Sequence, residues 1–417
     1  MDIKSISFYT FGCKVNQYET EKLKSLAQKE GWEVKPFGVE TDYIFINSCA
    51  VTHVAERKAR RLIKFLRNKF PNSKIVLAGC YPERMKDSIP NLDIDILLTN
   101  KEKWEFFNGD EFSFIPPLPQ ERTRALVKIQ DGCNQFCSYC IVPYLRGKER
   151  SKPLDLVIWE IENLINLGYK EIVITGVRLG AYGHDFQDRD ALSKLLQKLI
   201  QYPELKRIRL SSIEPMDITP SLIELASEEK ICRHWHIPLQ SGDDEILKKM
   251  RRRYNTSYYY EIIQELRKRV PDIAIATDII VGYPGENDIN FENTVNFIKK
   301  IGFMKLHVFP FSPRPGTLAE KEKPLPPDIV EERKKLLISL SEELWKKYAE
   351  RFIGREMEVL VEEVEHGLAE GLTDNYLRIV FHDTSVNKGD FVKVYLKEIN
   401  KERVFGERVR DILTVKT

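Results

Sequence analysis

The middle of the chain, from about residue 120 to about residue 345, repeats a strand-then-helix pattern six times. Each predicted strand is a short run of mainly apolar residues, and each is followed by apolar residues at helical spacing. The predicted strands are Leu126–Gln130, Glu171–Thr175, Arg207–Ser211, His234–Pro238, Ala274–Val281 and Lys305–Pro310. Six parallel units are too few to close the usual eight-fold ring, so the pattern predicts an open (β/α)6 partial barrel.

Three cysteines, Cys133, Cys137 and Cys140, follow the first of these strands in the run DGCNQFCSYC. They therefore lie on the loop at the strand's C-terminal end, where α/β barrels carry their chemistry. Three thiolates this close together cannot all pair as disulfides, which favours one metal ion or cluster. A structural zinc site usually has four ligands, and no histidine is near, so one coordination position is left open. A zinc knuckle is the alternative.

The regions on either side of the barrel have different patterns. Residues 1–115 alternate strands with helices, which predicts an N-terminal domain built on a parallel sheet. A proline-rich stretch at 115–119 links it to a core domain at 120–350. From 355 to 417, short strands separated by glycines predict a small antiparallel β-barrel of the OB type. The predicted strands of the first domain are Ser5–Thr10, Tyr43–Asn47 and Lys74–Ala78.

Three further cysteines, Cys13, Cys49 and Cys80, each end a predicted strand of the N-terminal domain. The C-terminal ends of strands in an open parallel sheet meet at one crevice, so these residues are expected to lie together. The alternative is three unrelated buried thiols, because cysteine is among the most buried residues. Cys232 has no partner nearby in sequence, and we expect it to be a core thiol.

Two three-cysteine sites with these flanks resemble one family. The motifs GCKVNQYET, NSCAVT and AGCYPE, followed by DGCNQFCSYCIVPYLRGKERS, are similar to those of the methylthiotransferase family of radical S-adenosylmethionine enzymes. The resemblance covers the whole chain and includes HIPLQSGDDEIL, TDIIVGYPGE and FPFSPRPGT. It implies a cluster-binding domain at 1–115, a radical core at 120–350 and a TRAM domain at 355–417.

The resemblance also implies the cofactors. The radical triplet, Cys133, Cys137 and Cys140, would ligate a [4Fe–4S] cluster whose fourth iron binds S-adenosylmethionine and, once reduced, generates a 5′-deoxyadenosyl radical. The auxiliary triplet, formed by the three N-terminal cysteines, would ligate a second [4Fe–4S] cluster that carries the sulfur to be inserted. A second S-adenosylmethionine would supply the methyl group. An electron donor such as flavodoxin or ferredoxin is the implied redox partner.

Residues at the ends of the barrel strands are candidates for contacts to S-adenosylmethionine. By resemblance, Tyr139 occupies the aromatic position that lies against the adenine, with simple packing as the alternative. A Gly-Gly-Glu run common in the superfamily is replaced here by Thr175-Gly176-Val177, so no acidic partner for the methionyl amine is assigned there. Arg314 is expected to face the same mouth. The predicted cofactor-binding residues are Tyr139, Ser211, Glu214, His236, Gln240 and Gly282. The structural alternative is a strand-end cap for the four polar residues after Tyr139 and an ordinary turn for Gly282.

The implied substrate of the family's RNA branch is adenosine 37 of tRNA, beside the anticodon, which is modified at C2. One branch acts on N6-threonylcarbamoyladenosine, one on N6-isopentenyladenosine, and one on an aspartate of a ribosomal protein. The flank GCKVNQYET is most similar to the first branch, and the lack of an apolar C-terminal tail resembles its bacterial form. The expected partner is therefore the anticodon stem-loop of tRNA. A zinc-containing RNA-binding protein without catalysis is the alternative from another class.

The net charge of +2, from 65 basic and 63 acidic residues, gives no global field that favours RNA. A local surface is predicted on the helix Val54–Phe70, whose basic residues gather on one face; the alternative is a solvated helix face. The run Arg251–Tyr254 is a second predicted patch. Residues 355–417 carry 10 basic and 13 acidic side chains, an awkward balance for binding RNA. The basic residues of the helix are Arg57, Lys58, Arg60, Arg61, Lys64, Arg67 and Lys69.

No signal peptide and no run of about eighteen apolar residues is present in the sequence. An odd number of cysteines, seven, favours reduced thiols over a disulfide scaffold. We therefore expect a cytoplasmic protein with neither a membrane nor DNA as its partner.

Overall fold

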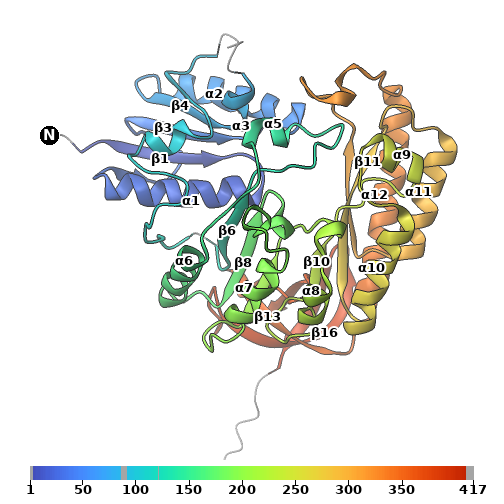
Figure 1. Cartoon of the computed structure of the whole chain (residues 1–417). Helices are drawn as coiled ribbons and strands as arrows, with labels where there is room; N and C mark the ends of the chain where they lie inside the picture. The colour runs from blue at the N-terminus through green and yellow to red at the C-terminus, as the bar shows by residue number, and fades with distance from the viewer. Residues whose placement is uncertain (1–2, 86–91, 121, 410–417) are drawn as a thin grey trace, which may run out of the picture.

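The structure is a computed structural model that describes residues 3–85, 92–120 and 122–409 (Figure 1). Its N-terminal domain is a five-stranded parallel sheet in the order β2-β1-β3-β4-β5. The strands are β1 Ser5–Thr10, β2 Glu33–Lys35, β3 Tyr43–Ser48, β4 Lys74–Gly79 and β5 Ile96–Leu98, and the helices are α1 Lys14–Lys29, α2 His53–Lys69, α3 Cys80–Arg84 and α4 Glu102–Glu105.

The two faces of this sheet are covered by different helices. Phe45 of β3 faces a core that includes Leu23 and Leu26 of α1. Its neighbours Ile44 and Ile46 face a second core that includes residues of α2. This alternation follows from the two-residue period of a strand, and it explains why the strands read as continuous apolar runs in the sequence.

The central domain is the predicted open barrel of six parallel strands. One sheet has the order β7-β6-β8-β9 and the other has the order β10-β11-β12. Parallel bridges from Ser212 to His236 and from Ile208 to Ile231 join the two sheets. The strands are β6 Ala125–Asp131, β7 Arg150–Ser151, β8 Glu171–Gly176, β9 Arg207–Leu210, β10 His234–His236, β11 Ala274–Val281 and β12 Lys305–Pro310; β7 is a short antiparallel addition to β6.

Helices cover the outer surface of this barrel (Figure 1). They are α6 Leu154–Asn166, α7 Ala191–Leu199, α8 Pro220–Leu225, α9 Asp244–Lys249, α10 Thr256–Arg269, α11 Asp288–Ile301 and α12 Pro327–Glu350. The short helix α5 Val142–Arg146 lies instead beside α3 of the N-terminal domain, where Leu145 shares a buried cluster with Tyr81 (Figure 1). None of the helices in the described part of the chain combines the length and apolar character that a bilayer crossing requires.

The last domain is a closed five-stranded barrel in the order β13-β14-β15-β17-β16. All neighbouring strands are antiparallel except β15 and β17, which pair in parallel. The strands are β13 Glu356–Glu365, β14 Leu368–Leu372, β15 Arg378–His382, β16 Phe391–Asn400 and β17 Arg403–Arg408. The prediction of a small barrel is confirmed, with this one parallel pair as a difference.

Two of these strands, β14 and β17, were not expected because their glycines resemble turn signals. Gly371 and Gly406 instead lie inside the strands, where the barrel wall curves tightly. A Cβ atom at Gly371 would lie 2.2 Å from the carbonyl oxygen of Leu360, and one at Gly406 would lie 2.4 Å from that of Tyr395. Glycine is therefore required for close approach of neighbouring backbones rather than for a turn.

The small barrel packs under the open barrel, at the end away from the cysteine loops (Figure 1). Trp345, Tyr348 and Phe352, on or just after α12, belong to the same buried cluster as the strands of the small barrel. Arg207, the first residue of β9, donates to the carbonyl oxygens of Leu372 at 3.1 Å and Glu358 at 2.7 Å. The two domains therefore share a core and a set of buried hydrogen bonds.

Candidate functional site

The radical triplet lies on the loop between β6 and α5, as predicted. Gly132 has a φ of +74°, and a Cβ atom there would lie 2.0 Å from the carbonyl oxygen of Lys148. Only glycine lets the chain turn so close beneath that segment. The Cys133 N–H donates to the carbonyl oxygen of Gly147 at 3.1 Å, and the Cys140 N–H donates to that of Cys137 at 3.0 Å. These bonds fold the three cysteines into one compact loop at the barrel mouth.

Two of the predicted cofactor-binding residues lie beside this loop. Arg252 places its Nη1 atom 3.3 Å from the Cys137 sulfur and pairs through its other terminal nitrogen with Glu214. Tyr139 packs against a buried cluster that includes Met250 and Tyr283. Tyr139 and Glu214 therefore surround the radical triplet, Glu214 through Arg252.

The prediction that Arg252 forms part of an RNA-binding patch is wrong. Its side chain is only 2% exposed because it is enclosed between Glu214 and the cysteine loop. Tyr254 is buried as well, and its hydroxyl donates to the carbonyl oxygen of Pro238 at 2.9 Å. Sequence alone did not distinguish these side chains from the exposed Arg251 and Arg253.

The auxiliary triplet gathers at one edge of the N-terminal sheet. Cys13 precedes α1, Cys49 follows β3 and Cys80 follows β4. All three line a single cavity of about 470 Å³. The C-terminal ends of β1, β3 and β4 therefore bring together residues that are far apart in the sequence, as an open parallel sheet requires.

The environment of the thiols fits soft metal ligands. Burial raises the pKa of Cys49 to about 12, and burial raises that of Cys140 to about 12, with the neighbouring Cys137 adding to the effect. Thiols with such pKa values become thiolates near neutral pH only when a bound cation stabilises the charge.

The spacing of the sulfur atoms is wider than a single zinc ion requires. Among the described residues, in neither triplet do all three sulfur atoms lie within 4.8 Å of one another. Zinc–sulfur bonds of about 2.3 Å in a tetrahedron hold sulfur atoms about 3.8 Å apart. Three cysteine ligands at each site, with no fourth ligand among the described cysteines, suit an iron–sulfur cluster with one open iron better than a closed four-ligand zinc site.

The cavity continues from the auxiliary triplet into the mouth of the open barrel. Its far wall includes Ser211, His236, Asp278 and His307, at the ends of barrel strands. The His236 Nε2 atom lies 3.0 Å from Asp278 Oδ1, and the rings of His236 and His307 stack with centroids 5.1 Å apart. Two predicted cofactor-binding residues, Ser211 and His236, thus face the auxiliary triplet.

The remaining two predicted cofactor-binding residues are not among the described residues that line this cavity. The Gln240 N–H donates to the carbonyl oxygen of Asp278 at 2.8 Å. Gly282 has a φ of +71°, and a Cβ atom there would lie 2.5 Å from a methyl group of Val330. Packing against α12 therefore explains this glycine without a cofactor.

Arg314 is buried against a carboxylate of the protein itself and is not exposed at the mouth of the barrel. It is 1% exposed and pairs with Glu56 of α2. Glu56 also accepts from Arg84 Nε at 2.6 Å. Because Arg314 belongs to the barrel domain and Glu56 to the N-terminal domain, this ion pair joins the two domains beside the site.

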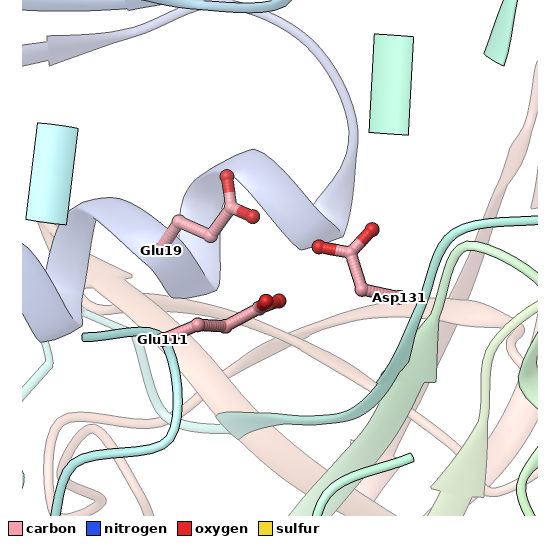
Figure 2. Close-up of side chains that lie close together, drawn as sticks. All are labelled: Glu19, Glu111 and Asp131. Atoms are coloured by element: carbon pink, nitrogen blue, oxygen red, sulfur yellow. The ribbon is translucent and has the colours of Figure 1, made fainter. Parts of the chain in front are cut away.

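Three carboxylates lie close together: Glu19 from α1, Glu111 from the segment after α4, and Asp131 at the end of β6 (Figure 2). Lys128 Nζ lies 2.7 Å from Glu19, 2.7 Å from Glu111 and 2.9 Å from Asp131. Although burial opposes it, Arg146 and Lys128 hold the pKa of Asp131 well below its usual range. The ammonium of Lys128 takes the place that a cation would occupy, so this is a buried ion-pair network rather than a metal site.

Arg146 extends this network to the auxiliary triplet, and the sequence analysis missed it. Its Nη1 lies 2.8 Å from Glu19 and 3.0 Å from Asp131, and its Nη2 donates to Asn16 Oδ1 at 2.7 Å. Arg146 also lines the cavity with Cys13, Cys49 and Cys80. Its place in the run YLRGK, six residues after Cys140, was the available signal.

The basic surface predicted on α2 is present in part. Arg67 is turned toward the protein, 3.1 Å from Asp93 and 2.5 Å from Asp95. Glu56, on the same helix, is buried with Arg84 and Arg314. The basic residues of α2 that are exposed are Arg57, Lys58, Arg60, Arg61, Lys64 and Lys69.

Basic side chains of the small barrel, in contrast, are engaged in ion pairs. Arg408 lies 3.0 Å from Asp383, and Arg403 lies 3.2 Å from Glu370. Lys397 pairs with Glu407 on the neighbouring strand. The α2 surface, which follows directly after Cys49, is therefore the better candidate for contact with phosphates.

Comparison with known families divides the chain as its architecture does. Residues 5–99 match the uncharacterized protein family UPF0004, residues 127–298 match the radical SAM superfamily, and residues 350–409 match the TRAM domain.

Relatives match almost the whole chain. The threonylcarbamoyladenosine tRNA methylthiotransferase MtaB of Bacillus subtilis is 38% identical, over 97% of this chain and 96% of its own. The protein of the same name from Thermotoga maritima is 38% identical, over 97% of both chains. The tRNA-2-methylthio-N(6)-dimethylallyladenosine synthase of Fervidobacterium nodosum is 34% identical, over 96% of this chain and 98% of its own.

A solved structure shares the fold at low identity. The radical S-adenosylmethionine methyltransferase TsrM from Kitasatospora setae superimposes with a TM-score of 0.57 at 14% identity, covering 76% of this chain and 77% of its own. This similarity supports the fold, an N-terminal α/β domain followed by an open barrel. At this low identity it says nothing about the substrate.

Proposed function

The chain belongs to the family of radical S-adenosylmethionine tRNA methylthiotransferases, and on that premise we propose that it acts on N6-threonylcarbamoyladenosine at position 37 of tRNA. It is a transferase, and in the proposed reaction it replaces the hydrogen at C2 with a methylthio group. The observation that carries the proposal is the cavity between the auxiliary triplet and the strand ends of the radical barrel. The names of two relatives, each 38% identical, support the threonylcarbamoyl substrate.

The residues present fit two [4Fe–4S] clusters, one on each triplet. Three soft sulfur ligands per site, with one coordination position left open, are the donor set that such clusters take. When bound, the cluster on the radical triplet would supply the one-electron reductive cleavage of S-adenosylmethionine that activates an unreactive C–H bond.

The protein's own groups would position and insulate these reactants. Arg252 would place a positive charge against the Cys137 ligand, and Glu214 holds Arg252 in that orientation. Ser211 and His236 would face a substrate base that enters between the triplets. The buried ion pairs of Glu19 with Lys128 and Arg146 would keep the N-terminal domain fixed on β6. Flavodoxin or ferredoxin remains our prediction for the electron donor.

The dimethylallyl branch is the second candidate, because a relative of that name is 34% identical over nearly the whole chain. The ribosomal-protein aspartate and the catalytically inactive zinc protein have weaker support. The relatives named above are tRNA enzymes, and the three-cysteine ligand sets favour a cluster over a four-ligand zinc site.

The test is a direct assay with three substrates. Anaerobically reconstituted protein, S-adenosylmethionine and a chemical reductant are incubated with tRNA bearing threonylcarbamoyladenosine, tRNA bearing isopentenyladenosine, or a ribosomal protein. Nucleoside and peptide mass spectrometry then locates any added methylthio group. Product on the threonylcarbamoyl tRNA alone supports the proposal, and product on either other substrate alone refutes it.

A further inference from the structure

One cation in the cavity has no partner of its own. Lys14 is the first residue of α1, directly after Cys13, and it lines the cavity shared by the auxiliary triplet and the barrel mouth. Its side chain makes no hydrogen bond or ion pair with any residue that the structure describes, although the residue is only partly exposed. A half-buried ammonium that pairs with no carboxylate of the described residues is costly, so an anionic ligand in the cavity would stabilise it.

Two arginines near Lys14 differ from it because each already has a carboxylate partner. Arg124 lies 2.8 Å from Glu362, and Arg209 lies 2.7 Å from Glu171, so both guanidinium groups already have carboxylate partners. Both guanidinium groups act electrostatically on Lys14, so they lie near it. Asp278 is the acidic residue among the described lining residues, and it already lies 3.0 Å from His236. A negative charge from a ligand would relieve this imbalance.

A second group in the cavity also lacks a partner. The Ser211 hydroxyl is buried, with the residue 5% exposed, and makes no hydrogen bond with the described residues. It lines the same cavity as Lys14. Buried hydroxyls are normally paired, so a polar group of a ligand is the expected partner.

We propose that Lys14 binds the carboxylate of the threonyl group on the N6 substituent, and that Ser211 hydrogen-bonds to the same substituent. This inference rests on the proposed function and names the residue that selects its substrate. In adenine, one ring nitrogen separates C2 from the carbon that bears N6. A base that presents C2 to the auxiliary triplet therefore directs its N6 substituent into the adjoining part of the cavity. A dimethylallyl group offers no charge to Lys14, whereas the threonylcarbamoyl group offers a carboxylate.

The test pairs a change in the protein with a change in the RNA. Three anticodon stem-loops are prepared, carrying threonylcarbamoyladenosine, its threoninamide analogue, or unmodified adenosine. Their dissociation constants are measured by fluorescence anisotropy for anaerobically reconstituted wild type, Lys14→Met and Lys14→Arg. We expect wild type to bind the carboxylate form about 10- to 100-fold more tightly than the amide, the range for a hydrogen bond to a charged group. Lys14→Met should bind both forms alike, and Lys14→Arg should keep part of the preference.

Each other outcome overturns the inference. If Lys14→Met still prefers the carboxylate, another group reads it. If Lys14→Met weakens binding of all three RNAs equally, Lys14 contacts a phosphate. If wild type does not distinguish carboxylate from amide, the carboxylate is not read at all, and this comparison needs no variant. Iron content and the visible spectrum are checked for each variant. If Lys14→Met loses its clusters, the comparison between wild type and Lys14→Arg becomes the test.

The two proposals fail in different ways. Failure of the proposed function would appear as wild-type enzyme that adds no methylthio group to threonylcarbamoyl tRNA. If only the present inference fails, wild type still forms the methylthio product. The preference for the carboxylate RNA over the amide RNA is then the same in wild type and in Lys14→Met.

Discussion

At the scale of single residues, we predict a different task for the cysteines of each triplet, and single substitutions can distinguish the two tasks. The radical triplet lies with Arg252 and Glu214, and the auxiliary triplet lies on the cavity. Cys137→Ala should abolish reductive cleavage of S-adenosylmethionine, whereas Cys49→Ala should retain some cleavage but insert no sulfur. Iron should fall from about eight to about four atoms per chain in each variant. Iron analysis and chromatography of 5′-deoxyadenosine measure both effects.

Cys232 provides the matched control for these variants. It is buried, as predicted, and it does not line the cavity of the auxiliary triplet. Cys232→Ala should therefore keep all the iron and the activity of wild type. Methylthiolation by Cys49→Ala at the wild-type level would refute the role of the auxiliary triplet.

The ion-pair network around Lys128 predicts a large loss of stability when this lysine is replaced by an uncharged residue. Lys128→Met would leave Glu19, Glu111 and Asp131 without the ammonium that contacts all three. Removing one partner from a buried charge group costs about 3–5 kcal/mol. Lys101→Met is the matched control, because Lys101 is 87% exposed and its pair with Glu105 lies on the surface, where such pairs contribute at most about 1 kcal/mol. Chemical denaturation of the reconstituted proteins compares the two, and equal midpoints would contradict the prediction.

At the scale of elements, α2 is the segment that we predict to contact the phosphates of tRNA. Arg57, Arg61 and Lys64 are exposed on one face at helical spacing, whereas Arg67 is held by two aspartates. Changing these three residues to glutamate should weaken tRNA binding and reduce the slope of log affinity against log salt by about 2 to 3. Iron content and S-adenosylmethionine cleavage should be unchanged, because Ala59, Ile63 and Leu66 form the buried face.

A charge-matched control lies on the outside of the barrel. Lys299, Lys335 and Lys347 are exposed on α11 and α12, so their change to glutamate alters net charge equally without touching α2. Filter binding across a salt titration compares the two triple variants. If both weaken binding to the same extent, net charge accounts for the effect and α2 has no specific role.

The helices and strands could be predicted from the local sequence pattern, but the contacts between distant segments could not. The apolar period places α2 within one residue of its observed ends, and β11 and β12 match their predicted bounds. The cysteines could be predicted to converge because strand ends of a parallel sheet meet. By contrast, the burial of Arg252 and the ion pair between Arg314 and Glu56 depend on how distant segments pack. Nothing in the local sequence distinguishes a buried arginine from an exposed one.

For the molecule as a whole, the small C-terminal barrel is part of the fold rather than a detachable module. If the small barrel were only a detachable RNA clamp, a truncation near Gly354 would keep both clusters and lose only RNA affinity. The structure opposes this expectation, because the small barrel shares its core with Trp345 and Phe352. Arg209 also donates to the carbonyl oxygens of Asp374 at 2.9 Å and Thr373 at 3.1 Å.

Truncation after Gly354 should therefore unfold or aggregate the remaining chain instead of merely weakening RNA binding. It would expose three large aromatic side chains and leave buried groups of Arg207 and Arg209 without their acceptors, and each unpaired group costs about 1–3 kcal/mol. Co-expression of residues 1–354 with residues 355–417 as separate chains is the control, since the two pieces should co-purify and recover the iron content of wild type. Thermal unfolding and iron analysis distinguish the outcomes. A truncated chain with the melting temperature and iron content of wild type would show that the small barrel is dispensable for folding, leaving RNA capture as its role.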